Sequence, residues 1–177
     1  EQRLRESGMG CTILRPNAFM DVWFAMMIEL PAFTDHPVTL VGEGRRRHSF
    51  IAERDVAAFA MAVVRNEEAR NETLPLGGPE ALSFRDAVGI YEVAMGRPIH
   101  VNTVPPGAPI PLLPEVVWGI AAALESYDSP IPMEETARRY GVTLTRALDL
   151  ARSRVPHADA LTATVSVPPS GSARPPR

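Results

Sequence analysis

The chain has 177 residues, of which 45% are hydrophobic and 22% are charged, so it is long enough for one domain with a hydrophobic core. Its formal net charge of -3 argues against nucleic acid as a partner, because neutralising phosphates needs a basic surface. The 18 basic residues are all arginines, which excludes a complete lysine-dependent step, such as a Schiff base or a Tyr/Lys reductase pair, within these residues.

The first 31 residues predict two helices around one short strand. Residues 1–7 suit a helix, and residues 11–14 form an apolar run of the kind found in strands buried on both faces of a parallel sheet. From Asn17, a good N-cap, apolar residues repeat at helical spacing as far as Leu30, and Pro31 is expected to end the helix. This stretch is too short and too polar to cross a bilayer, so no membrane partner is expected.

The single cysteine, Cys11, excludes an internal disulfide and predicts a reducing, cytoplasmic location. We expect it to be a buried strand residue, since no histidine lies close to it in the sequence. The chain opens with Glu1 rather than Met and enters a helix at once. We interpret this as a cut through a larger domain.

The middle of the chain alternates strands with helices. Asp55 is expected to cap one helix, and Ser83 with Asp86 predicts a capping box for a second helix, which Gly96 ends. Strands are predicted at residues 38–41, 48–52, 73–76 and 99–104. The segment Gly42-Glu43-Gly44-Arg45-Arg46-Arg47 lies between the first two and predicts a solvated hairpin turn.

After a proline-rich bend, the chain predicts three more helices. The first carries the apolar residues Val116, Val117, Ile120, Ala121 and Leu124. Two shorter helices are expected at 134–140 and at about 144–153. Residues 156–177 are rich in Ser, Thr and Pro and predict a disordered tail, because they cannot bury enough apolar surface to offset their ordering entropy.

The alternation of strands and helices predicts an α/β fold with a partial parallel sheet. We expect a sheet region at 1–104, a helical lid or substrate region at 105–155 and a tail at 156–177. These short strands are too few for a self-sufficient doubly wound sheet. The missing strands are therefore expected before Glu1.

Several short passages carry a resemblance to a known family. They are residues 1–8 with 12–16 and Phe19-Met20, then Ser49-Phe50-Ile51 with Asp55-Val56-Ala57, then Gly77-Gly78-Pro79-Glu80 with Ser83-Phe84, and finally Gly96-Arg97-Pro98-Ile99. In this order they resemble the C-terminal portion of atypical short-chain dehydrogenases/reductases of the NmrA-like type. The resemblance implies a Rossmann-like domain that binds NADP or NAD.

The same resemblance implies parts that this sequence does not contain. The glycine-rich phosphate turn of the family belongs near its N-terminus, and its Tyr/Lys pair would place the Lys before Glu1. Gly42-Glu43-Gly44 is a poor substitute, because Arg47 stands where the third glycine would be and the segment is expected to join two strands. The missing N-terminal half of the same domain is thus the expected partner.

The candidate cofactor site is the turn formed by Arg15, Pro16, Asn17, Ala18 and Phe19. It leaves the first strand at its carboxyl end, where open α/β sheets collect their ligands, and the resemblance implies that it lies beside the nicotinamide. The alternative interpretation is a strand terminator followed by an N-cap.

The candidate substrate pocket consists of Phe19, Met20, Trp23 and His48. An indole and a thioether suit an apolar ligand, and an imidazole could pair with a substrate carbonyl. The alternatives are that the helix is core and that His48 is a surface strand residue. No spacing of His, Cys and acidic residues suggests a metal.

These observations predict a segment of an NAD(P)H-dependent oxidoreductase acting on an unknown small molecule by hydride transfer. One alternative is a dinucleotide-binding sensor without catalysis, and another is a truncated product with no activity of its own. We expect the chain alone to bind NADPH very weakly and to self-associate through exposed strand edges.

Overall fold

The structure is a computed structural model that describes residues 1–156. Its helices are α1 (Gln2–Glu6), α2 (Met20–Phe24), α3 (Leu30–Phe33), α4 (Glu53–Val64), α5 (Phe84–Met95), α6 (Glu115–Leu124), α7 (Glu134–Tyr140) and α8 (Ala147–Arg154). Its strands are β1 (Ile13–Pro16), β2 (Val38–Val41), β3 (Thr73–Leu76) and β4 (Val101–Val104). A π-helical turn (Ala25–Glu29) joins α2 to α3, and a 3-10 turn (Glu67–Ala69) follows α4. The predicted disordered tail, apart from Pro156, lies outside the described residues.

The strands form two separate parallel pairs. β1 pairs with β3, with Ile13 opposite Thr73 and Leu14 opposite Leu74. β2 pairs with β4, with Val38 opposite Val101. The prediction of an α/β fold with parallel strands is therefore confirmed, although the strands lie in two small sheets.

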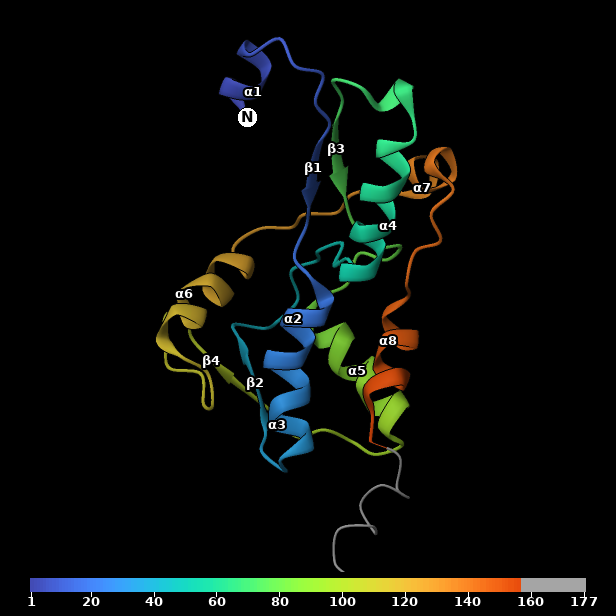
Figure 1. The fold of residues 1–177 in the computed structure, drawn as a ribbon. Coiled ribbons are helices and arrows are strands. Elements are labelled where there is room, and N and C mark those ends of the chain that lie inside the picture. Colours follow the sequence, from blue (N-terminus) through green and yellow to red (C-terminus); the bar gives the residue numbers. More distant parts are fainter. Residues whose placement is uncertain (157–177) are drawn as a thin grey trace, which may run out of the picture.

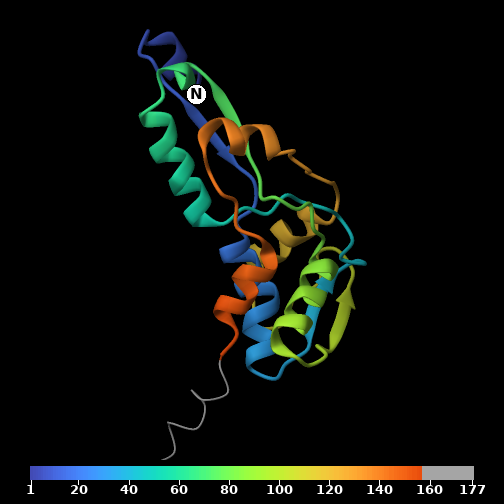
Figure 2. The same cartoon turned by 90° about the vertical axis from the view of Figure 1, so that its right-hand side faces the viewer.

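Figures 1 and 2 show these pairs as the centres of two regions, one above the other. We call α1, β1, α4, β3 and α7 the β1–β3 unit, and the remaining elements the β2–β4 unit. The larger hydrophobic core belongs to the β2–β4 unit, where the ring of Phe24 lies 5.0 Å from Phe50 and 6.2 Å from Tyr91. A smaller core holds Phe59, Leu74 and Leu76 beneath α4 and α7.

The β1–β3 sheet is covered incompletely by the described residues. β1 pairs with β3 alone, so its other edge carries no strand within residues 1–156. Leu74 and Leu76 face the small core, whereas Arg15 and Pro75, which lie opposite each other, are exposed. Parallel sheets are normally covered on both faces, so this pair resembles the margin of a larger sheet.

The helix predicted from Asn17 to Leu30 has other ends in the structure than predicted, and its interior is interrupted by a π-helical turn. It begins at Met20 with Phe19 as the N-cap, and it passes through the π-helical turn before ending at Phe33. Asn17 does not cap it because its side chain is engaged elsewhere. Pro31 is tolerated because it lies in the first turn of α3, where a missing N–H group costs little.

The predicted strand at 48–52 and the hairpin before it are wrong. β2 finds its partner in β4, and residues 48–51 make only isolated bridges, which pair His48 with Leu82, His48 with Ser129 and Ile51 with Phe19. Because this segment bonds to three different parts of the chain, it cannot form a ladder with any one of them. Gly42 and Gly44 adopt positive φ angles in the turn after β2.

One more expectation about helices is corrected. Asp55 is not the cap of α4, whose N-cap is Ala52; its buried carboxylate instead accepts hydrogen bonds from Thr145. The helix predicted after the proline-rich bend is α6, in which Val117, Ala121 and Leu124 are buried while Val116 and Ile120 are exposed.

Other boundaries agree or shift by a few residues. The capping box of Ser83 and Asp86 and the left-handed stop at Gly96 are confirmed, and so are strand 73–76 and helix 134–140. The first strand lies two residues later than predicted, which leaves Cys11 half-buried just before it. The last strand and the last helix begin at Val101 and Ala147.

Candidate functional site at the carboxyl end of β1

The turn that leaves β1 is held by the backbone of two other segments. The Asn17 N–H donates to the carbonyl of Leu76 at 2.8 Å, which extends the pairing with β3 beyond the strand. The Ile51 N–H donates to the carbonyl of Ala18, and the Met20 N–H donates to the carbonyl of Ile51, each at 3.0 Å. The turn is therefore a fixed feature at the carboxyl end of β1, where parallel α/β sheets place their ligands.

The side chain of Asn17 links this turn to the segment that follows α6. Its Nδ2 donates to the carbonyl of Ser129 at 2.8 Å and lies 3.1 Å from the Ser129 hydroxyl, while its Oδ1 accepts the Ala18 N–H at 2.8 Å. Sequence reasoning missed Ser129, because it lies 112 residues from Asn17 and belongs to no recognisable motif.

Arg15 points away from the turn and toward the N-terminal helix. Its Nε donates to Glu1 at 3.0 Å, and its Nη2 forms an ion pair with the same carboxylate. The hydrogen bond from Arg15 lowers the pKa of Glu1, and the Glu1 carboxylate in turn raises the pKa of Arg15. In this arrangement Arg15 holds α1 and leaves Pro16, Asn17, Ala18 and Phe19 as the accessible part of the turn.

The candidate substrate residues fall into two environments. Phe19 and Trp23 are half-buried, and the Trp23 ring meets Phe84 edge-on with centroids 6.1 Å apart. Met20 is only 1% exposed and belongs to the core of the β2–β4 unit. The structure thus leaves Phe19 and Trp23 within reach of a ligand and buries the Met20 thioether.

His48 is buried, so the alternative interpretation of it as a surface strand residue is wrong. Its Nδ1 lies 2.7 Å from the Ser129 hydroxyl and its Nε2 lies 2.9 Å from the carbonyl of Leu124. Burial lowers the pKa of His48 below its ordinary value of 6.5. Because the imidazole is buried, a substrate would contact the groups that surround the ring, such as the Ser129 hydroxyl, before it reached the ring itself.

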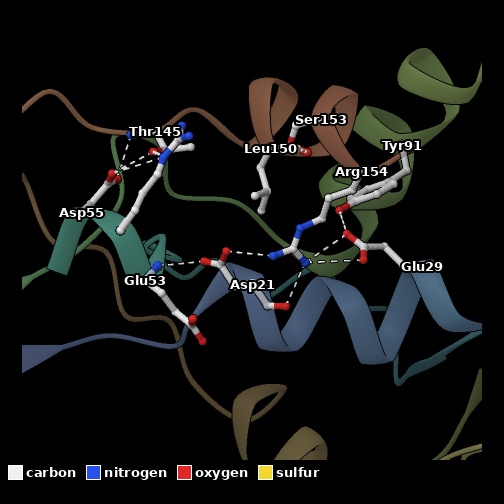
Figure 3. A network of polar contacts seen from close by, with 10 residues as sticks. Asp21, Glu29, Glu53, Asp55, Tyr91, Thr145, Leu150, Ser153 and Arg154 are labelled. Carbon is white, nitrogen blue, oxygen red and sulfur yellow. Dashed lines mark hydrogen bonds and ion pairs between the residues drawn. The ribbon is translucent and has the colours of Figure 1, made fainter. Parts of the chain in front are cut away.

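Figure 3 shows two polar clamps that connect α2, α4 and the segment that ends in α8. Arg154, at the end of α8, donates to Asp21 at 2.8 Å and to Glu29, and Tyr91 donates to Glu29 from α5. The other oxygen of Asp21 accepts the Glu53 N–H at the start of α4, also at 2.8 Å.

The second clamp joins α4 to the segment before α8. The backbone N–H and the hydroxyl of Thr145 each donate to the Asp55 carboxylate at 2.7 Å. Residues 145–154 thereby tie the two units together, since α4 belongs to one and α8 to the other.

The three arginines of the turn after β2 border an open hollow of about 670 Å³. Each is already paired with an acid: Arg45 with Glu43 at 3.0 Å, Arg46 with Asp128 at 3.2 Å and Arg47 with Asp86 at 3.4 Å. Balanced charge of this kind makes the turn a poor phosphate site.

The described residues contain neither a grouped set of metal ligands nor a helix suited to a membrane. Within residues 1–156, no three His, Cys, Asp or Glu side chains are grouped as metal ligands. No helix in that range combines the length and the apolar character that crossing a bilayer requires.

No protein-family model matches the chain, but curated proteins do. A stretch of 100 residues is 29% identical to the NAD(P)H azoreductase of Xenophilus azovorans and covers 56% of this chain and 34% of that protein. A stretch of 102 residues is 29% identical to the bifunctional pinoresinol-lariciresinol reductase of Linum corymbulosum. It covers 55% of this chain and 32% of that protein. The chain matches about a third of the length of these relatives.

Solved structures match a larger part of the chain. The triphenylmethane reductase of Citrobacter sp., complexed with NADP(H), has a TM-score of 0.69 at 16% identity, covering 86% of this chain and 56% of that one. The NADPH-dependent quinone oxidoreductase of Escherichia coli has a TM-score of 0.68 at 15% identity, covering 86% and 57%. The fold is therefore that of Rossmann-like reductases, and the cofactors in these names are of the predicted class.

Proposed function

We propose that this chain supplies the nicotinamide-side turn and part of the substrate pocket of an NAD(P)H-dependent reductase. The observation that carries the proposal is the turn after β1, which is fixed by backbone bonds at the carboxyl end of a parallel strand. The similarity to reductases named for NAD(P)H and NADPH supports the cofactor class.

The turn offers one free backbone donor for such a cofactor. Hydrogen bonds within the described residues use the N–H groups of Asn17, Ala18 and Met20, but none is found for Phe19. A nicotinamide carboxamide needs a donor of this kind for its oxygen. When bound, the cofactor would supply the hydride, and Phe19 would orient the ring that carries it.

The phosphate-binding part of the cofactor site would come from the other half of the same domain. The open edge of β1 and the exposed face at Arg15 and Pro75 favour further strands and a covering layer there. On this proposal the chain alone binds NADPH too weakly for turnover. Calorimetric titration of the chain with NADPH checks this, and a micromolar dissociation constant contradicts it.

We assign the substrate side of the pocket to Phe19 and Trp23, which are half-buried next to the turn. Two aromatic side chains at this place suit a substrate with an apolar or aromatic part. The names of the azoreductase and of the triphenylmethane reductase are compatible with an aromatic substrate.

Splitting the cofactor into its two halves tests the proposal on the chain itself. Millimolar reduced nicotinamide mononucleotide should shift the amide NMR signals of Asn17, Phe19 and Ile51, whereas 2′-phospho-ADP-ribose should leave them unchanged. Phe19→Pro should abolish the shifts, because proline can adopt the φ of −75° at this position but has no N–H. Phe19→Leu retains the N–H and serves as the control. Equal shifts with both halves, or with both variants, contradict the assignment.

A further inference from the structure

A Ser–His pair, Ser129 and His48, lies beside the turn, and the proposed reductase function gives neither residue a role. The Ser129 hydroxyl is 2.7 Å from His48 Nδ1, and Leu124, the last residue of α6, holds the opposite ring nitrogen at 2.9 Å through its carbonyl. A hydroxyl paired with an imidazole that a third group orients is the arrangement of activated nucleophiles.

The hydrogen bonds fix which atom carries each proton. A carbonyl oxygen only accepts, so Nε2 of His48 must carry the hydrogen that faces Leu124. Burial lowers the pKa of His48 and so favours the neutral imidazole, against the opposing influence of the Leu124 carbonyl, Asp128 and Glu125. Nδ1 is therefore bare, and the hydroxyl of Ser129 must donate to it.

A donor for a developing negative charge stands beside the hydroxyl. Asn17 Nδ2 lies 3.1 Å from Ser129 Oγ, and its other hydrogen is held by the Ser129 carbonyl at 2.8 Å. To act as an oxyanion donor, this amide would turn the hydrogen that now faces Oγ toward the oxygen on the carbon bonded to Oγ. Ser129 thus has a base on one side and an oxyanion donor on the other.

Open space lies beside the neighbours of Ser129 in the chain, although Ser129 itself does not line it. Ser129 is half-buried, and both of its neighbours in the chain, Asp128 and Pro130, border the hollow of about 670 Å³ at Arg45–Arg47. The mixed charges of that hollow suit a polar substrate more than a lipid.

We propose that Ser129 is a nucleophile for acyl transfer from small polar esters, with His48 as its general base and Asn17 as the oxyanion donor. Ser129 Oγ bonds to the acyl carbon while its proton passes to His48 Nδ1. The carbon–oxygen bond to the leaving alcohol then breaks, and His48 returns the proton to that alcohol. Water, activated by the same imidazole, releases the acid and restores the hydroxyl, so that atoms and protons balance.

Labelling the full chain with diisopropyl fluorophosphate tests the nucleophile directly. Peptide mass spectrometry should find the phosphoryl group on Ser129, and Ser129→Ala should abolish it. Ser126→Ala, at an exposed serine of the same segment, should label like the parent chain. Labelling that is absent, or that persists in Ser129→Ala, overturns the proposal.

Hydrolysis of p-nitrophenyl acetate tests the base, and the assay contains no dinucleotide, so its outcome is independent of the reductase proposal. We expect His48→Gln to lower the rate at least tenfold and Asn17→Ala to lower it less. Circular dichroism identifies variants that fail to fold. If a variant does not fold, the pH dependence of hydrolysis by the unmodified chain tests the proposal instead. The rate of the unmodified chain should rise with pH to a midpoint below 6.5; a rate that follows hydroxide alone, unchanged by Ser129→Ala, overturns the proposal.

Discussion

The two regions of the molecule are built on the same element, a pair of parallel four-residue strands, yet they differ in how well that element is covered. All four residues of β2 are buried, whereas none of the four in β1 is. β2 lies in the large core formed with α2, α5 and α6, while β1 pairs with β3 and packs through Leu14 on the small core of α4 and α7. Strand geometry is thus the same in both, and burial is conferred by neighbouring elements.

The boundary between the two regions, which we call the seam, is held by a close backbone contact and by the charged clamps, not by a shared sheet. Gly78 passes so near Phe50 that a Cβ atom would lie 1.9 Å from its carbonyl oxygen. The clamps at Asp21 and Asp55 bring α4 and α8 together. The two regions should consequently unfold together as long as the seam is intact.

Of the variants considered, Gly78→Ala should lower the unfolding free energy most, and it should uncouple the unfolding of the two regions. The new methyl group would collide with backbone rather than with a movable side chain, so we expect a loss of more than about 3 kcal/mol in unfolding free energy, measured by urea denaturation. Gly89→Ala is the control, because it has open space around it and lies inside α5, where alanine should stabilise by roughly 0.5–1 kcal/mol. Equal effects at both positions would contradict the proposed contact.

Arg154→Met should weaken the β2–β4 unit by about 2 kcal/mol, less than for a fully buried pair because Arg154 is 28% exposed. It leaves the carboxylates of Asp21 and Glu29 without their cation. Arg46→Met removes an ion pair in which both side chains are about half exposed, so it should cost less than about 1 kcal/mol. Thermal unfolding of both variants measures the difference, and similar costs would show that the clamp adds little.

The uncovered strand should make the chain self-associate. We expect light scattering to show a mass that rises with protein concentration, and Ile13→Lys, on the strand with the open edge, should reduce the effect. Met61→Lys, at an exposed position of α4, adds the same charge away from that edge and should change little. A monodisperse monomer with a cooperative melt would argue against an uncovered edge.

The smallest effect concerns the pH dependence of the β1–β3 unit. Hydrogen bonds from Arg139 and Tyr140 hold the pKa of Glu72 below its ordinary 4.5. Because the folded state binds this proton less readily than the unfolded state, the stabilisation is present above pH 4.5 and is lost as the pH falls through the lowered pKa. Glu72→Gln should flatten this part of the melting profile. Glu53→Gln, at an exposed residue, should leave it unchanged.

The elements that could be predicted are those whose signals are local. Ser83 with Asp86 marks a helix start, Gly96 marks a helix end, and residues 73–76 are a strand by their apolar run. Asn17 and Asp55 were both expected to be caps, because a short polar side chain before a helix has that chemistry in either case. Their true partners, Ser129 and Thr145, lie 112 and 90 residues away.

The α/β class and most of the strands and helices could thus be predicted from local patterns, whereas the cofactor site at the turn after β1 stays a prediction. Long-range packing alone shows that His48 is buried against Ser129 and that residues 48–51 bond to three segments. It also shows that β1 has an open edge within residues 1–156. This difference arises because periodicity and caps depend on neighbours within a few residues. Burial and side-chain pairing depend on which distant segments the whole fold brings together.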